Sequence, residues 1–335
     1  MNSFLEDIEN SIFSKRYPMR EGFVFTSILP GEKNKETIVI KTPRDIPCSS
    51  PCINGSYRSL EEHIEYINYH KIKNALIISK NIDFIVQCPT LKHLWIVPAD
   101  SAGDGFDYSP LYKLPEIKSL QCSTVYGEKE EYSTYIDCSK LNNIEDIHVL
   151  NSKYQNFNTV KTLKSLGLTG YKETDLSNSF DSPILDTLSI FQSKIKSLDG
   201  IQKSSKMQCL YLYYNRSLQD ISSLIRVKNT LKALRIDCCP KINDFSVLGK
   251  LENLEFLELT GSNILPNLSF LKTMPNLKTF LFDMNVEDGD ISPCLNLSYV
   301  YSRKNRKHYN LKDEDLPKGA YVRGNETIEE WRRLI

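Results

Sequence analysis

Two cysteines of the segment CSSPC, Cys48 and Cys52, have a spacing that can serve zinc, because thiolate sulfur is a preferred zinc ligand. A structural zinc site needs further ligands, and only His63 and His70 are near in the sequence. No second close pair of cysteines or histidines follows, so we interpret Cys48 and Cys52 as ordinary loop cysteines and keep zinc as the alternative. The sequence therefore predicts no metal site and no cofactor.

Nucleophilic catalysis needs a nucleophile, a base and an orienting group, and their usual motifs are missing. The chain has neither a GxSxG motif nor a glycine-rich phosphate loop. His148 lies in IEDIHV beside Glu145 and Asp146, where an exposed surface histidine is preferred to a general base. We therefore expect no enzymatic activity.

The charges argue against two classes of partner. The 335 residues include 42 basic and 42 acidic side chains, which cancel, so no net field attracts the protein to nucleic acid or to an anionic membrane. The basic run RKNRKH, residues 303–308, is interpreted as a solvated edge in preference to a phosphate site. The abundance of Lys, Asn, Ile, Ser and Tyr is typical of AT-rich bacterial coding sequences.

The compartment is predicted from the N-terminal sequence and the cysteines. MNSFLEDIENSIF lacks the features of a secretory signal, and no apolar run approaches the length of a membrane span. Nine cysteines spread thinly along the chain favour free thiols, with adjacent Cys238 and Cys239 interpreted as structural. We expect a cytoplasmic protein.

A repeat organises most of the chain and must position any functional side chain. The pattern apolar-x-x-apolar-x-apolar recurs at intervals of 22 to 24 residues, which is typical of a solenoid, and its last three positions alternate as in a strand. The strong copies are LKSLGL (163), LDTLSI (185), MQCLYL (207), LKALRI (231), LEFLEL (254) and LKTFLF (277). Weaker copies are IKNALI (72), LKHLWI (91), IKSLQC (117), IEDIHV (144) and LSYVYS (297).

A second signature begins with Asp or Asn on the far side of each unit. Examples are DYSPL (107), DISSL (220), DFSVL (244), NLSFL (267) and DISPCL (290). The side-chain oxygen can accept from free N–H groups of a following 3₁₀-like turn. Between strand and turn, small polar residues are expected to bond the bending backbone: Ser193, Asn215, Cys239, Ser262 and Asn285, with Tyr171 as an exception.

These motifs resemble the leucine-rich repeat family, whose consensus LxxLxLxxN matches MQCLYLYYN and LKTFLFDMN. The period and the back segment are similar to the bacterial internalin-like subgroup. The resemblance implies an α/β solenoid with a parallel sheet on the concave face, short 3₁₀ or irregular segments on the convex face, and a role in protein binding.

Three regions are expected. Residues 1–60 form an N-terminal cap with a short helix and a hairpin made by EGFVFTSIL and ETIVIKTP, residues 61–305 form the solenoid, and residues 306–335 form a C-terminal cap. LEEHIEYINYH is interpreted as the first helical piece of the array. Thr327 and Glu330 resemble a capping box within the last region.

Outward side chains between the strand hydrophobes are the candidate binding residues. They are aromatic and charged, as interface hot spots are. The predicted protein-binding residues of the concave face are Trp95, Phe191, Tyr211, Tyr213, Arg235, Asp237, Glu258, Asp283, Tyr301 and Arg303. We expect them outside the core, with Glu258 at a binding rim.

The predicted function is non-enzymatic binding of another protein by a monomer, with an inhibitor or immunity-type role as one version. A secreted or surface adhesin is the alternative if the true N-terminus lies upstream. The recognition part of a repeat-containing enzyme is a further alternative, for which about 60 and 30 residues outside the array leave little room.

Overall fold

The computed structural model describes residues 19–26, 37–42, 58–98, 106–122, 135–150 and 154–321. The chain divides into two compact units, the first comprising Met1–Asn156 with Glu330–Ile335 and the second Phe157–Glu329. Cys48, Cys52, Thr327 and Glu330 lie outside the described residues. Within the described ranges, no helix is long and apolar enough to cross a membrane.

The described part of the first unit contains the α-helix α2 and a sheet of short strands. Its elements are β1 (Met19–Arg20), β2 (Phe23–Thr26), β3 (Thr37–Thr42), α2 (Leu60–His70), β4 (Asn74–Ser79), η1 (Asp83–Gln87), β5 (His93–Pro98), η2 (Ser109–Lys113), β6 (Ser119–Cys122), β7 (Ile136–Asp137), η4 (Cys138–Lys140), β8 (Asp146–Leu150) and β9 (Tyr154–Gln155), where η denotes a 3₁₀ helix. β1, β2 and β3 pair antiparallel, and β3 to β6 and β8 follow in parallel.

The first turn of α2 is stabilised by a reciprocal pair of hydrogen bonds between Ser59 and Glu62. The Glu62 N–H donates to Ser59 Oγ at 3.1 Å, and the Ser59 N–H donates to the Glu62 carboxylate at 2.6 Å, which completes a capping box. The helix ends at Lys71 in the left-handed conformation. The predicted helix LEEHIEYINYH and the hairpin of β2 and β3 are thus present, whereas the capping roles of residues 1–60 and 306–335 stay predictions.

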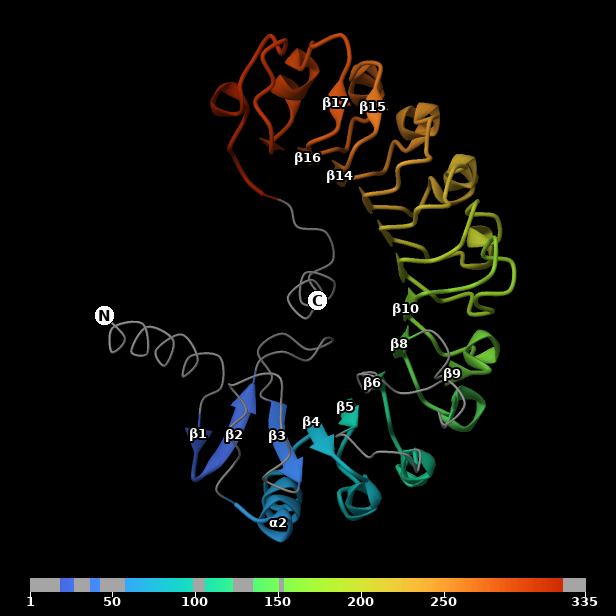
Figure 1. The fold of residues 1–335 in the computed structure, drawn as a ribbon, viewed down its shortest axis with the longest axis vertical. Helices are drawn as coiled ribbons and strands as arrows, with labels where there is room; N and C mark the ends of the chain where they lie inside the picture. The colour runs from blue at the N-terminus through green and yellow to red at the C-terminus, as the bar shows by residue number, and fades with distance from the viewer. Residues whose placement is uncertain are drawn as a thin grey trace. The chain divides into compact units, whose positions relative to one another are not determined.

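The second unit is a regular array of coils. Its elements are η6 (Phe157–Thr159), β10 (Ser165–Thr169), β11 (Thr187–Phe191), η7 (Ile201–Lys203), β12 (Cys209–Tyr213), η8 (Ser222–Val227), β13 (Ala233–Asp237), η9 (Ser246–Lys250), β14 (Phe256–Thr260), β15 (Ile264–Leu265), η10 (Ser269–Thr273), β16 (Thr279–Phe282), β17 (Asn285–Val286), η11 (Ser292–Asn296), β18 (Tyr299–Ser302) and η12 (Asp313–Asp315). β10, β11, β12, β13, β14, β16 and β18 pair in parallel in this order. Within this unit the strands line one side and the 3₁₀ helices the other (Figure 1).

The Asp or Asn residue that begins each second signature accepts a backbone N–H group, as predicted. Asp220, Asp244 and Asp290 each accept the N–H of the serine two residues on, at 2.8 to 3.0 Å, and so does Asn267 at 2.9 Å. Each serine begins a 3₁₀ helix. The acceptor therefore satisfies an N–H that the short helix itself leaves without a carbonyl.

The core of the second unit is built from the repeat hydrophobes. Leu210, Leu234 and Leu257 lie in register on successive strands and are fully buried. Leu224 and Leu248 of the 3₁₀ helices are buried in the same interior. Stacking of similar coils therefore gives one continuous apolar core, as in other repeat proteins.

Polar corner residues stabilise the bend after each strand. The Ser193 N–H donates to Asn215 Oδ1 at 3.0 Å, and Asn215 Nδ2 donates to the Ile190 carbonyl at 2.8 Å. In the coil after β14 the corner residue is buried Asn263, whose Nδ2 donates to the Cys239 carbonyl at 3.0 Å. The predicted corner residue, Ser262, is exposed instead. That coil has one additional residue between the strand and the corner.

A column of left-handed residues ends the strands of the second unit. Gly170, Gln192, Tyr214, Cys238 and Gly261 each directly follow a strand and have φ between 48° and 129°. The first four donate their N–H to a carbonyl of the next coil, from Gly170 to Phe191 at 2.9 Å through Cys238 to Thr260 at 3.0 Å, and Gly261 donates to the Asp283 carboxylate at 2.7 Å. The left-handed conformation turns each N–H toward the next coil. Three of these residues are not glycine, so this conformation is sterically unfavourable for them.

Candidate functional site

Strand register determines which candidates lie together. Because side chains alternate along a strand, residues that flank a buried leucine point to the outward face of the sheet. The middle outward row of the second unit consists of Ser189, Tyr211, Arg235, Glu258, Leu281 and Tyr301. A neighbouring row contains Phe191, Tyr213, Asp237 and Thr260. The predicted candidates from Phe191 to Tyr301 therefore share one face, with Asp283 and Arg303 directly after β16 and β18.

The structure corrects the expectation that these side chains lie outside the core. Tyr211 and Glu258 are 0% exposed and Arg235 is 1% exposed, and Phe191 and Tyr213 are also buried. The Phe191 and Tyr213 rings stack with centroids 4.8 Å apart and an angle of 12° between planes. Strands about 4.8 Å apart bring bulky side chains into van der Waals contact, so the row packs on itself. Tyr301 is 43% exposed and remains accessible.

Arg235 contacts aromatic rings and the Glu258 carboxylate. Its guanidinium carbon lies 5.3 Å from the centroid of Tyr211 and 4.9 Å from that of Phe256, and Nη1 donates to the Tyr213 hydroxyl at 3.4 Å. Burial is the largest single effect and disfavours the charged guanidinium, but the Glu258 carboxylate together with Tyr213 and Tyr211 outweighs it, so the pKa of Arg235 is raised. Cation–π contacts and an ion pair thus fix one cation in the row.

Glu258 joins two arginines that come from different coils. Its Oε2 lies 3.1 Å from Arg235 Nε, and its Oε1 accepts from Arg303 Nη2 at 2.8 Å. Arg303 keeps 37% of its side chain exposed, whereas Glu258 and Arg235 are buried. Glu258 is therefore an internal counter-ion and not the rim residue that the sequence suggested.

The other charged candidates lie at the end of the strands. Lys304 Nζ is 3.4 Å from Asp283 Oδ2, and Arg306 Nη2 donates to the Asp283 carbonyl at 3.0 Å. Residues 303–308 are thus partly paired with acidic residues of their own unit. Lys307 is exposed, as expected for a solvated edge.

The alternating pattern also contains an outward position that the sequence analysis did not consider. It is the third position of each unit, which holds Cys209, Phe256 and Tyr299.

Trp95 belongs to the first unit and is described there alone. It is partly buried against Val24, Val39, Leu76 and Ile78, which form an apolar cluster on the outward face of β2 to β4. Its large ring therefore contributes to packing within the unit. Its role in partner binding stays a prediction.

His148 differs from its predicted environment. His148 lies on β8, opposite Gln121 of β6, and its side chain is buried. Burial lowers the pKa of the imidazole to about 4. The expected exposed surface histidine is therefore wrong, because the outward side of β8 is covered. A side chain with this pKa is neutral at pH 7.

Among the described residues, the cysteines are free thiols. Cys88, Cys122, Cys138, Cys209, Cys238, Cys239 and Cys294 are free, and all except Cys238 are buried. Burial raises the pKa of Cys88 to about 11 and that of Cys239 to about 12, which disfavours the reactive thiolate. In the described ranges no group of three or more His, Cys, Asp or Glu side chains is placed to hold a metal ion.

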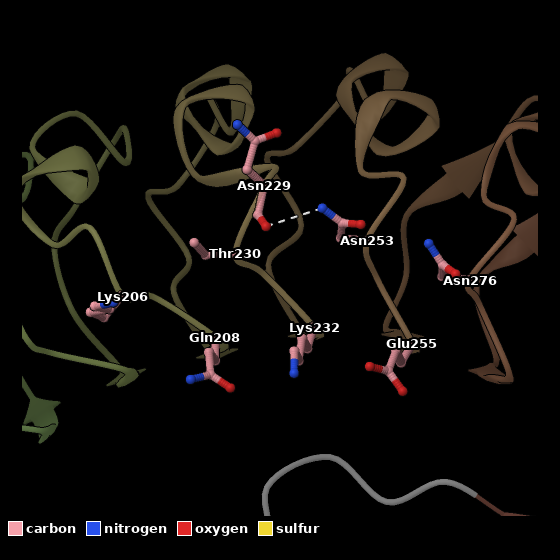
Figure 2. Close-up of a pocket in the computed structure, with 8 residues that line it drawn as sticks. All are labelled: Lys206, Gln208, Asn229, Thr230, Lys232, Asn253, Glu255 and Asn276. Atoms are coloured by element: carbon pink, nitrogen blue, oxygen red, sulfur yellow. Dashed lines mark hydrogen bonds between the residues drawn. The ribbon is translucent and has the colours of Figure 1, made fainter.

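A shallow depression of about 480 Å³ lies on the flank of the second unit, where turns lead into β12, β13 and β14 (Figure 2). Its lining consists of Lys206, Gln208, Asn229, Thr230, Lys232, Asn253, Glu255 and Asn276. Asn253 donates to the Asn229 carbonyl at 3.0 Å, and Asn276 donates to the Glu252 carbonyl at 2.9 Å. These amides therefore connect adjacent coils, and none of the predicted site residues lines the depression.

Comparison with known proteins defines the class of fold. No protein-family model matches the chain, and no curated protein matches it. Among solved structures, an internalin from Listeria monocytogenes is similar over 77% of this chain and 76% of that chain, with 15% identity and a TM-score of 0.50. The protein therefore has the leucine-rich repeat fold, an α/β solenoid in which parallel strands alternate with 3₁₀ segments.

Two further solved structures overlap this chain less closely. The functional domain of the Listeria monocytogenes internalin InlJ has 14% identity and a TM-score of 0.44 and covers 64% of this chain, which spans 43% of that domain's chain. A leucine-rich repeat protein of Leptospira interrogans has 14% identity and a TM-score of 0.36, with 75% of this chain and 82% of that chain covered.

Proposed function

We propose that the protein binds another protein, without catalysis, through the outward sheet face of its second unit. Repeat solenoids generally use extended sheet or helix surfaces for binding. The observation that carries the proposal is an exposed aromatic and cationic edge on that face. Tyr301 and Tyr321 are exposed there, and Arg303 reaches solvent from a fixed ion pair with Glu258.

This edge has the properties of an interface anchor. The Glu258 carboxylate holds Arg303, and Lys318 Nζ lies 5.5 Å from the Tyr301 centroid, so long side chains are ordered before a partner arrives. Ordered side chains lose less conformational entropy on binding. Tyrosine and arginine are also enriched among hot-spot residues. Among the other predicted candidates of this face, the partly exposed Asp237 and Asp283 are included in this proposal. Phe191, Tyr211, Tyr213, Arg235 and Glu258 are buried, and Trp95 belongs to the first unit.

The proposal includes a cytoplasmic location and an inhibitor or immunity-type role. Free cysteines are usual in reducing compartments, and the seven described thiols support that location. Occupation of a toxin or an enzyme by the outward face is one concrete version of the role.

The test begins with affinity capture from the native organism, followed by mass spectrometry and titration calorimetry with the recovered partner. Tyr301→Ala and Arg303→Ala should each weaken binding by about 2 kcal/mol, the scale of hot-spot residues. Tyr69→Ala is the matched control, because Tyr69 is exposed on α2 in the first unit. The proposal is wrong if the control weakens binding while both variants of the edge bind like the unmodified protein.

A further inference from the structure

Three ion pairs at the last coils of the second unit expose the cation and bury most of the carboxylate. The pairs, with the exposed fraction of each side chain, are Arg303 (37%) with Glu258 (0%), Lys304 (55%) with Asp283 (16%) and Lys318 (38%) with Asp313 (22%). Lys161 and Asp181, which pair in an earlier coil of the same unit, are exposed almost equally, at 64% and 61%. Solvent at the last coils therefore faces positive charge, although each pair as a whole is neutral.

Lys318 is held in place because the chain after η12 pairs with the outer edge of β18. The Val300 N–H donates to the Pro317 carbonyl at 2.8 Å, and the Gly319 N–H donates to the Ser298 carbonyl at 2.9 Å. The Lys318 Nζ donates to the Val300 carbonyl at 2.7 Å. A cation that is fixed in this way loses little conformational entropy when an anion binds to it.

Aromatic rings lie beside the exposed cations. The Lys318 Nζ is 5.8 Å from the ring centroid of Tyr299 and 5.5 Å from that of Tyr301. The ring of exposed Tyr321 lies 5.1 Å from that of Tyr299 on β18 and 6.4 Å from that of Phe256 on β14. The edge thus combines flat apolar area with positive charge, a composition that is typical of protein interfaces.

The excess of positive charge is local. Residues 299–321 contain six basic and three acidic side chains, a net charge of +3, in a chain whose formal net charge is zero. Of the three acidic residues, the exposed Glu314 and Asp315 both lie beside Lys312 on η12. The cationic surface is therefore one short edge and not a long stripe.

We propose that the edge formed by Tyr301, Arg303, Lys304 and Lys318 binds an acidic segment of the partner protein. This inference rests on the proposed function, because it names the chemistry of the partner at the same site. Within the described ranges, Arg303 donates only through Nη2, to Glu258. A guanidinium carries five N–H groups, so others can donate to a carboxylate of the partner.

The same observations favour an acidic protein segment over nucleic acid or an anionic membrane. Affinity for nucleic acid comes from the neutralisation of many phosphates, and a short edge backed by carboxylates offers few cations for this. The zero net charge of the chain provides no long-range attraction to a polyanion or a charged bilayer. A few carboxylates among apolar side chains match the cations and the tyrosines of the edge.

Oligo-glutamate is the probe for this proposal, because its side chains supply carboxylates and no other charged group. Binding of the fluorescein-labelled peptide to the full chain is followed by fluorescence anisotropy, with oligo-glutamine of equal length as the uncharged control. We expect oligo-glutamine to bind about tenfold more weakly or less, and added salt to weaken the binding of oligo-glutamate, because salt screens exposed charges.

Two double variants remove the same charge from different places. Arg303→Gln with Lys304→Gln changes the edge, whereas Lys206→Gln with Lys232→Gln changes the depression on the flank (Figure 2). The edge variant should bind oligo-glutamate about fivefold more weakly or less, and the flank variant within about twofold of the unmodified protein. Thermal melting checks that both fold. Lys304→Gln alone keeps the pair of Arg303 with Glu258 and replaces the edge variant if that variant does not fold.

Three results would overturn the proposal. The first is equal affinity for oligo-glutamate and oligo-glutamine, and the second is an equal loss of affinity in the edge and flank variants. The third is binding of single-stranded DNA or phosphatidylserine vesicles that is tighter than that of oligo-glutamate and is lost in the edge variant, which would assign the edge to nucleic acid or membrane.

The acidic segment and the proposed function can fail separately. Loss of the recovered partner in Tyr301→Ala, without binding of oligo-glutamate, would reject the acidic segment alone. Binding of oligo-glutamate at the edge, with a recovered partner that ignores both Tyr301→Ala and Arg303→Ala, would reject the proposed function alone.

Discussion

Arg235 and Glu258, on adjacent strands, form an ion pair of 3.1 Å with side chains that are 1% and 0% exposed. Two charges at this depth stabilise each other, because a buried charge needs a counter-ion. Exposed Arg303 shares the same carboxylate. The three side chains link β13, β14 and the residue after β18.

Removal of the shared carboxylate should be costly. We expect Glu258→Ala to lower the free energy of unfolding by about 3 to 5 kcal/mol, because buried Arg235 loses the carboxylate that it pairs with. Arg303→Ala should cost about 1 kcal/mol or less, since solvent screens a side chain that is one-third exposed. Urea unfolding of both variants measures the difference, and equal effects would contradict the internal counter-ion.

Two tyrosines of the middle outward row should respond differently to truncation. Tyr211→Ala should destabilise the protein by about 3 kcal/mol or more, because a fully buried aromatic ring leaves a cavity. Tyr301→Ala should change stability by about 0.5 kcal/mol, as is usual for exposed positions. Thermal melting with circular dichroism compares them. A neutral effect at Tyr211 would contradict its burial.

The left-handed column predicts a stabilising glycine. Gln192 has φ of 48°, a conformation that costs a side-chain-bearing residue about 1 kcal/mol or more, so Gln192→Gly should be neutral or raise the free energy of unfolding by up to about 1 kcal/mol. Gln208→Gly is the matched control, because Gln208 is also exposed but is not among the positive-φ residues. There glycine should lower stability by about 0.5 to 1 kcal/mol. Chemical denaturation measures the free energy of unfolding of both variants. A loss of stability at both positions would contradict backbone strain at Gln192.

His148 should make stability depend on pH. Its folded-state pKa of about 4 lies below the ordinary value of 6.5, so between these values the unfolded chain binds a proton that the folded protein does not. This contribution is present above about pH 6.5 and is lost as the pH falls toward 4, by about 3 kcal/mol.

The measurement is the free energy of unfolding at pH 7.5 and pH 5. His148→Gln should show a smaller loss between these pH values than the unmodified protein, because glutamine does not titrate. A His148 imidazole that titrates near its ordinary value in NMR spectra would contradict the burial.

The coils could be predicted because their causes are local. LEFLEL and the matching hexamers fix strands such as β14, and Asp244 or Asn267 fixes the start of a 3₁₀ helix two residues later. The corner at Asn263 was missed by one residue, since a single extra residue in a bend does not disturb the repeat period. Sequence spacing thus determines the order of elements better than the detail of a turn.

The candidate site was predicted only in part. Alternation shows on which side of the sheet Tyr211, Arg235 and Glu258 lie, and that side is correct. It carries no information on how tightly the side chains of that side pack, so their burial could not be inferred. The contact between Tyr321 and Phe256 joins residues that are distant in the sequence and follow no period, and no local pattern indicates it.

The pairing of residues 317–319 with β18 also limits growth. A parallel sheet whose last strand were bare would offer unpaired N–H and carbonyl groups to the strand of another molecule, and identical coils would stack end to end into fibres. Pro317 accepts the Val300 N–H but has no N–H of its own, and Gly319 donates to Ser298, so this edge is already paired. Among the described residues, this segment thus closes the end of the sheet at β18, and a tandem copy fused after Ser302 would first have to move it aside.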